Sequence, residues 1–174
     1  MTFENGAIIA AGDSGFSRVE TDVCGIIDAP IEAVWNLFTD WSGIHKWFKA
    51  PIAPKDVVRS DLLPGQTETM LPRTRMIEFG GPDAAEPPVP ETLLHTDAHT
   101  RTLYYRVEGV RPSGYRDYLC YVSMDATPDG GTALRINARM TAPTERADLV
   151  RKAITAVHRD GIIANFQRYL AAKD

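Results

Sequence analysis

The stretch DAPIEAVWNLFTDWSGIHKWFKAP, Asp28 to Pro51, holds all three tryptophans of the 174-residue chain. Trp35, Trp41 and Trp47 are spaced six residues apart, and two phenylalanines lie close to them in sequence. Side chains this large and apolar either build a core or wall a space in which another molecule binds. The rest of the sequence has to decide between these two possibilities.

The stretch itself predicts two short helices. Pro30 suits the first turn of a helix, where a missing backbone N–H costs nothing, and Asp28 or Ala29 would cap that turn. A second helix is expected to restart at Thr39 or Asp40 and to end in the sequence KAPIAP. Apolar residues at helical spacing give the first helix one buried stripe: Ile31, Val34, Trp35 and Phe38.

Alternating apolar residues on both sides of the stretch predict β-strands. Turn sequences at residues 98–100 and 126–131 join two pairs of these strands into hairpins. Residues 55–61 are short and are expected at a sheet edge. The predicted strands cover residues 18–28, 55–61, 74–81, 91–97, 101–109, 115–125 and 132–141.

A long amphipathic helix is predicted over residues 144–173, with Thr144 as its cap. An antiparallel sheet with one apolar face must be covered, and this helix is the largest element that can cover it. One helix covers only part of six to seven strands, so we expect the sheet to curve around it and leave an interior space. The predicted fold is α+β, and the tryptophans would wall one side of that space.

Four short motifs follow one another along the chain: DAPIEAVW at 28–35, Asp40 with Trp47, the hairpin residues Glu91, Asp97, Arg101, Leu103, Tyr105 and Val107, and GGTAL at 130–134. Through them residues 18–172 resemble the polyketide cyclase/dehydrase and lipid-transport family. That family belongs to the SRPBCC superfamily, with the START domains and the birch pollen allergen proteins. The proline-rich loop at 80–90 is a departure, and is expected to be either a lid or an edge cover.

The resemblance implies a helix-grip fold, in which a curved antiparallel sheet holds a long C-terminal helix and encloses a deep, mostly apolar cavity. Members of the family bind lipids, hormones, quinones or aromatic polyketides, and some are cyclases or aromatases. The family has no shared catalytic triad. The resemblance therefore implies a fold and a ligand class and leaves the activity open.

Composition and charge exclude several other classes of protein. The net charge of −4 and the lack of a Lys/Arg cluster argue against nucleic-acid binding. No run approaches the roughly 20 apolar residues of a membrane span.

Residues 1–17 do not read as a signal peptide and are expected to form a flexible arm before a single domain at 18–174. Cys24 and Cys120 are expected to be reduced core thiols, so we predict a cytoplasmic protein. It is expected to be a monomer or homodimer.

Neither a metal nor a cofactor is predicted. His95 and His99 are four residues apart, a spacing that suits zinc on a helix, but the sequence HTDAHTR around them is typical of a turn between strands. The chain contains none of the short motifs that bind phosphates, dinucleotides or catalytic zinc. The predicted partner is a hydrophobic small molecule.

His158 and Asn165 are the polar candidates on the long helix, near its apolar stripe and on either side of Gly161. A glycine inside a helix costs roughly 1 kcal/mol relative to alanine, so Gly161 indicates a close approach or free space. Either these side chains face a ligand in the cavity, or they find partners in water and backbone. Both are predicted as ligand-binding residues.

Three aromatic residues complete the predicted site. Trp47 is expected at the cavity rim, and Tyr105 points inward because its neighbours Arg106 and Glu108 favour solvent. Periodicity does not decide which face of strand 115–125 is buried. The set that contains Tyr118 is the more apolar one, but a polar cavity would reverse that choice, and we predict Tyr121 in the site.

The sequence predicts binding of an aromatic, polyketide-like or lipid-like molecule between the sheet and the helix. The alternative is an enzyme of cyclase/aromatase, dehydratase or lyase type. In that case His158 or Glu78 would move a proton, and Glu78 would need to face inward, where desolvation raises a carboxyl pKa.

Overall fold

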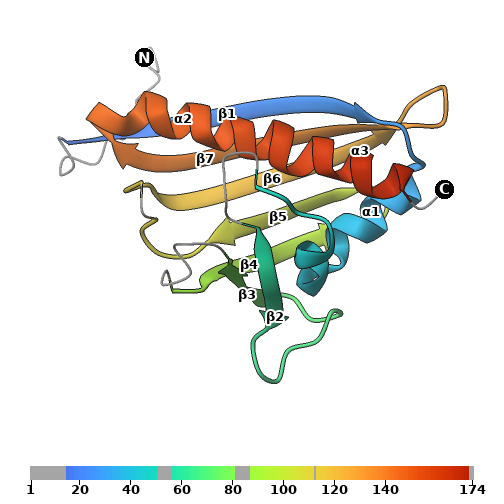
Figure 1. Cartoon of the computed structure of the whole chain (residues 1–174), viewed down its shortest axis with the longest axis horizontal. Coiled ribbons are helices and arrows are strands. Elements are labelled where there is room, and N and C mark those ends of the chain that lie inside the picture. Colours follow the sequence, from blue (N-terminus) through green and yellow to red (C-terminus); the bar gives the residue numbers. More distant parts are fainter. Residues whose placement is uncertain (1–14, 51–55, 81–86, 112, 173–174) are drawn as a thin grey trace, which may run out of the picture.

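The computed structural model describes residues 15–50, 56–80, 87–111 and 113–172. One antiparallel sheet contains seven strands in the order β1-β7-β6-β5-β4-β3-β2, and a long C-terminal helix crosses one of its faces (Figure 1). The strands are β1 (Phe16–Ile27), β2 (Val57–Leu62), β3 (Arg73–Phe79), β4 (Val89–Asp97), β5 (Thr102–Val107), β6 (Arg116–Ala126) and β7 (Thr132–Pro143). The helix-grip α+β fold is confirmed, and β2 lies at the predicted sheet edge.

The helices fall into two groups. After β1 come α1 (Ile31–Thr39) and the 3₁₀ helix η1 (Trp41–Lys46), as predicted. At the C-terminus a 3₁₀ turn, η2 (Thr144–Arg146), leads into α2 (Ala147–Ala156), the π-helical segment η3 (Val157–Ile163) and α3 (Ala164–Ala171). No helix in the described ranges is long and apolar enough to cross a membrane.

The ends of the predicted helices differ from the structure in detail. Pro30 is the residue before α1, and its carbonyl accepts hydrogen bonds from the N–H groups of Ala33 and Val34. Thr144 makes no capping bond; its hydroxyl instead pairs with that of Ser17 at 3.0 Å. Pro30 therefore acts at the start of its helix through its backbone carbonyl. The side chain of Thr144 instead ties the start of the C-terminal helix to β1.

The N-terminal part of the chain corrects two further expectations. Residues 1–14 of the predicted arm lie outside the described residues, whereas Phe16 and Ser17 already pair with the end of β7. Cys120 is buried, but Cys24 is exposed, so it is not a core thiol. Cys24 belongs to the outward set of β1, because the side chains of a strand alternate between its faces and its neighbour Val23 is buried.

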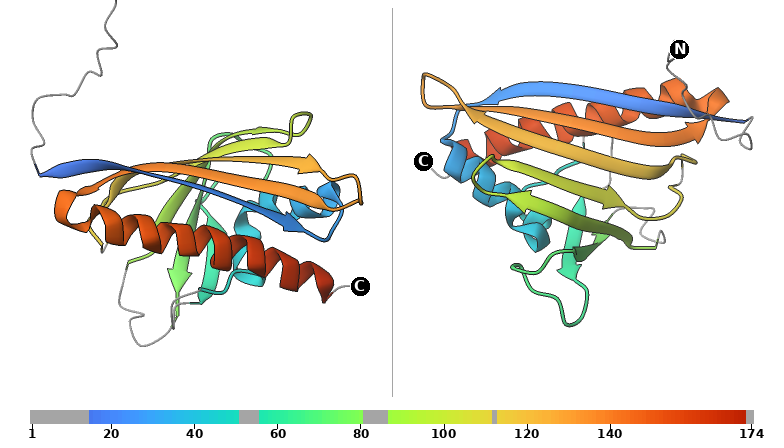
Figure 2. Two further views of the ribbon diagram at one scale, coloured as in Figure 1. Left: turned by 90° about the horizontal axis from the view of Figure 1, so that it is seen from above. Right: turned by 180° about the vertical axis from the view of Figure 1, so that it is seen from behind.

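The C-terminal helix lies along the β1 side of the sheet and not over its middle (Figure 1). Seen from above, it runs along one face of the sheet (Figure 2). The two elements approach closely at Gly25, where a Cβ atom would stand 2.7 Å from Cγ2 of Ile163. A glycine in β1 thus allows the helix to seat against this edge strand.

We expect Gly25→Ala to destabilise the protein by about 1–3 kcal/mol, because the new methyl group overlaps Ile163 and the helix must shift. Chemical denaturation would measure this change. Gly15→Ala is the matched control, since no heavy atom lies within 4 Å of a Cβ there. Equal stability of the two variants would show that the helix is not held at this contact.

Candidate functional site

A cavity of about 580 Å³ lies between the inner face of the sheet and the C-terminal helix. Its wall is mainly apolar, and the helix contributes Ala153, Ile154, Val157 and Ile162 to it. Seven of the lining side chains are aromatic: Phe38, Trp47, Phe48, Phe79, Tyr105, Tyr115 and Tyr118. The polar residues on the wall besides the tyrosines are Arg75, Glu91, Arg111 and Ser113.

The three tryptophans have three different roles. Trp35 is a buried core residue that does not line the cavity. Trp41 is fully buried, and its ring lies 3.8 Å from the guanidinium carbon of Arg75. Trp47 lines the cavity and packs against Phe166 with ring centroids 4.3 Å apart. The stretch that contains them therefore builds part of the core and part of a wall.

Trp47 also presents an unsatisfied polar atom. Its side chain is 5% exposed, and its indole N–H is buried without a hydrogen-bond partner among the described residues. A buried donor that lacks a partner costs roughly 1–3 kcal/mol.

An ion pair is built into the wall where β3 and β4 run side by side. Arg75 and Glu91 are direct cross-strand partners, and their side chains are 6% and 15% exposed. Nε and Nη2 of Arg75 donate to Glu91 Oε2 at 3.0 and 2.5 Å, and Nη1 donates to the carbonyl oxygen of Trp41 at 2.8 Å. Because both charges are paired and hydrogen-bonded, they are tolerated inside an apolar cavity.

A chain of hydrogen bonds leads from the cavity wall into the helix–sheet contact. The hydroxyls of Tyr105 and Tyr118 are 3.4 Å apart, and Tyr118 pairs with Nε2 of His158 at 2.8 Å. Nδ1 of His158 is 3.4 Å from the hydroxyl of Thr21 on β1. Burial lowers the pKa of His158 to about 4 and raises the pKa of both tyrosines well above their usual value of 10.0.

Of four predicted site residues, two line the cavity and two are buried in the contact between the helix and its neighbours. Trp47 and Tyr105 line the cavity, as the sequence predicts. His158 and Asn165 are buried but are not among the lining residues. The amide of Asn165 donates at 2.7 Å to the carbonyls of Lys49 and Gly161, so its polar atoms serve the packing of the helix. His158 reaches the cavity only through Tyr118.

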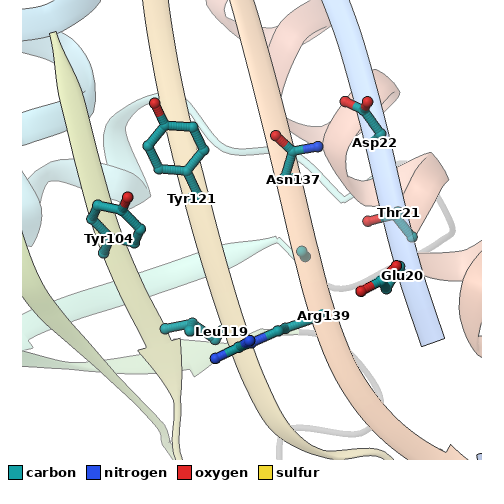
Figure 3. Close-up of a pocket in the computed structure, with 9 residues that line it drawn as sticks. Glu20, Thr21, Asp22, Tyr104, Leu119, Tyr121, Asn137 and Arg139 are labelled. Carbon is teal, nitrogen blue, oxygen red and sulfur yellow. The ribbon is translucent and has the colours of Figure 1, made fainter. Parts of the chain in front are cut away.

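Tyr121 faces the wrong side of the sheet for the predicted role. Figure 3 shows it with Asn137 and Asp22 in a pocket of about 620 Å³ on the outer face, opposite the C-terminal helix. On β6 the buried set is Tyr118, Cys120, Val122 and Met124. Apolarity therefore decided the face of this strand, and the assignment of Tyr121 to the interior site was wrong.

Glu78 also lies outside the cavity. On β3 the buried positions are Arg73, Arg75 and Ile77, so Glu78 belongs to the opposite face. Its side chain is 42% exposed and stands 3.8 Å from Arg59 in a surface ion pair. It therefore cannot act on a molecule held between the sheet and the helix.

Sequence patterns alone do not single out the polar residues that face the cavity. An arginine on a strand normally faces solvent, so the sequence does not mark Arg75 as an interior residue, although it lies on the same face as Ile77. Glu91 carried a signal, since it opens one of the family motifs. Tyr118 belongs to the more apolar face of its strand, and this is the face that points into the cavity. The sequence prediction took the opposite face, which contains Tyr121.

We expect His158 to make stability depend on pH. Because burial lowers its pKa from 6.5 to about 4, the unfolded chain binds a proton between these pH values that the folded protein does not bind. The free energy of unfolding should therefore fall as the pH drops from about 6.5 to about 4, by an amount on the order of 3 kcal/mol, with no contribution from this group at higher pH.

Urea unfolding at a series of pH values would measure this dependence. His158→Gln is the control, because glutamine keeps hydrogen-bonding groups and does not titrate. The stability difference between the two proteins should change across this pH window. A difference that stays constant from pH 7.5 to pH 4 would contradict the account of a buried neutral imidazole.

Comparisons with solved structures find the same fold. The protein XoxI from Bacillus cereus aligns with a TM-score of 0.67 at 20% identity, over 90% of this chain and 99% of that one. A protein from Bacillus thuringiensis gives 0.69 at 18% identity, over 87% and 99%. Truncated norcoclaurine synthase from Thalictrum flavum gives 0.65 at 11% identity, over 90% and 95%.

At these identities the likeness is one of fold. A comparison with curated proteins gives no match. A family described as polyketide cyclase / dehydrase and lipid transport matches residues 18–171, which is most of the chain. The chain therefore belongs to the polyketide cyclase / dehydrase and lipid transport family, whose members bind hydrophobic ligands or act as cyclases.

Proposed function

We propose that the protein binds a hydrophobic small molecule, of aromatic, polyketide-like or lipid-like type, in the cavity between the sheet and the C-terminal helix. The observation that carries this proposal is the cavity itself. Its volume of about 580 Å³ falls within the roughly 300–1,000 Å³ of small-molecule sites. A hydrophobic molecule that fills this space would remove apolar side chains from water, which favours binding.

The wall favours a ligand with rings. Trp47 and Phe48 come from the segment after α1, whereas Tyr105 and Tyr118 come from neighbouring strands, so aromatic side chains approach the space from two directions. Aromatic pairs prefer offset or edge-to-face contacts, and a planar ligand between such walls makes them on both sides.

The rival function is an acid–base enzyme of cyclase/aromatase, dehydratase or lyase type. The hydrogen-bonded chain from Tyr105 through Tyr118 to His158 is the observation that favours it. The directions of the pKa shifts oppose it. Efficient proton transfer requires a group whose pKa lies near the working pH. Near pH 7 His158 is neutral and Tyr118 is protonated, because burial moves the pKa of each group away from that pH. Binding is therefore the better supported function.

Native mass spectrometry of the freshly purified protein, followed by organic extraction, would test the proposal. A defined extra mass that extracts as an apolar compound would support binding and would identify its chemistry. Turnover of that compound when it is returned to the protein would favour the enzyme instead.

We expect Ala153→Leu to weaken binding. Ala153 lies on α2 and lines the cavity, so a larger side chain there occupies the space of the ligand without removing any polar contact. Calorimetry with 2-naphthol should give an affinity lower by about tenfold or more, because overlap with a bound ring costs at least 1.4 kcal/mol by the usual conversion.

Ala171→Leu is the matched control for this experiment. Ala171 is the last residue of α3, is exposed and does not line the cavity. It should bind 2-naphthol as the unmodified protein does. Equal affinities of the Ala153 and Ala171 variants would place the bound molecule elsewhere on the protein.

A further inference from the structure

The two carboxylate oxygens of Glu91 have different surroundings. Oε2 accepts both of the hydrogen bonds that Arg75 donates to this carboxylate. Oε1 accepts no hydrogen bond from any residue in the described part of the chain, although Glu91 lines the cavity. A carboxylate oxygen has two lone pairs and is a strong acceptor. One strong acceptor is thus left over on a mainly apolar wall.

The position of Glu91 is fixed by its surroundings. Arg75 is held on one side by the Trp41 ring, 3.8 Å from its guanidinium carbon, and by the Trp41 carbonyl at 2.8 Å. The indole N–H of Trp41 donates to the backbone carbonyl of Glu91 at 3.3 Å. Trp41, Arg75 and Glu91 therefore form one connected unit, which we call the β3–β4 anchor. A fixed acceptor binds a donor with less loss of conformational freedom than a mobile one.

The charge of the anchor restricts what it can bind. Arg75 and Glu91 already neutralise each other at 2.5 Å. Arg111 is a second cation on the wall, so a cationic ligand would add to an excess of positive charge, and an anionic group beside Glu91 would meet the free carboxylate oxygen. The other polar residues on the wall are Arg111, Ser113 and three tyrosines. The hydroxyls of Tyr105 and Tyr118 pair with each other, and Arg111 makes one long contact of 3.5 Å with the Glu108 carbonyl. A neutral donor fits best beside Glu91.

We propose that the cavity selects a neutral ring compound that carries a hydroxyl group, such as a phenol or a ring alcohol, and that Oε1 of Glu91 accepts the hydrogen bond of this hydroxyl. This inference rests on the proposed function, because it concerns the same cavity. It goes further by naming the ligand group that is recognised and the residue that recognises it. Glu91 is thereby a specificity-determining residue.

The test compares three naphthalenes that have the same ring system. 2-Naphthol carries a hydroxyl donor, 2-acetonaphthone carries only an acceptor, and 2-naphthoate is an anion. Calorimetry at pH 7 should show that the wild-type protein binds 2-naphthol about tenfold or more tightly than each of the others, as expected for one hydrogen bond to a charged acceptor.

Glu91→Gln should shift this preference toward 2-acetonaphthone. Arg75 can only donate, so the amide oxygen of glutamine should take the place of Oε2 and the NH₂ group should take the place of Oε1. The variant then offers the ligand a donor where the wild type offers an acceptor. It should gain affinity for 2-acetonaphthone relative to 2-naphthol by about tenfold or more.

Glu108→Gln is the control, since Glu108 pairs with Arg106 and does not line the cavity; it should keep the wild-type preference. Equal binding of all three probes by the wild type would overturn the hydroxyl inference and leave the cavity proposal intact. Tighter binding of 2-naphthoate, or an unchanged preference in a folded Glu91→Gln protein, would also overturn it. If none of the probes binds, the proposed function itself fails.

Discussion

The off-centre position of the C-terminal helix is the constraint on which the rest of the structure depends. A sheet of seven strands has more apolar surface than one helix can cover. Gly25 lets the helix pack closely on β1 through Ile163, and this contact fixes it at one side of the sheet. The inner faces of the strands farther along the sheet then need another cover. The aromatic segment after β1 supplies part of it, and the remaining space is the cavity.

Polar atoms inside such a space are costly unless they are paired, and most of them here are paired within the protein. The carboxylate of Glu91 holds Arg75, and the imidazole of His158 holds Tyr118. Glu91 Oε1, on a residue that lines the cavity, accepts no hydrogen bond from the described residues. This acceptor specifies where a donor group of a bound molecule would lie.

The sequence predicted the fold more completely than the site. Periodicity gives the strands, the hairpins and the long helix because each depends on local spacing, and the motifs add the helix-grip arrangement. The site depends on which face of each strand is buried. The β3 strand reads as polar on both faces, so Arg75 became visible as an interior residue only through its cross-strand partner Glu91. His158 was placed correctly near the stripe, but its partner Tyr118 comes from a strand forty residues away.

Methyl NMR of the isoleucine side chains would test the central claim most directly. Four isoleucines line the cavity: Ile44, Ile77, Ile154 and Ile162. Ile26 is 62% exposed on β1 and serves as an internal control. On titration with 2-naphthol, the account predicts saturable shifts of the four cavity methyl signals and none for Ile26. Shifts confined to Ile26, or no shift at the four cavity residues, would contradict the claim that this space is a binding site.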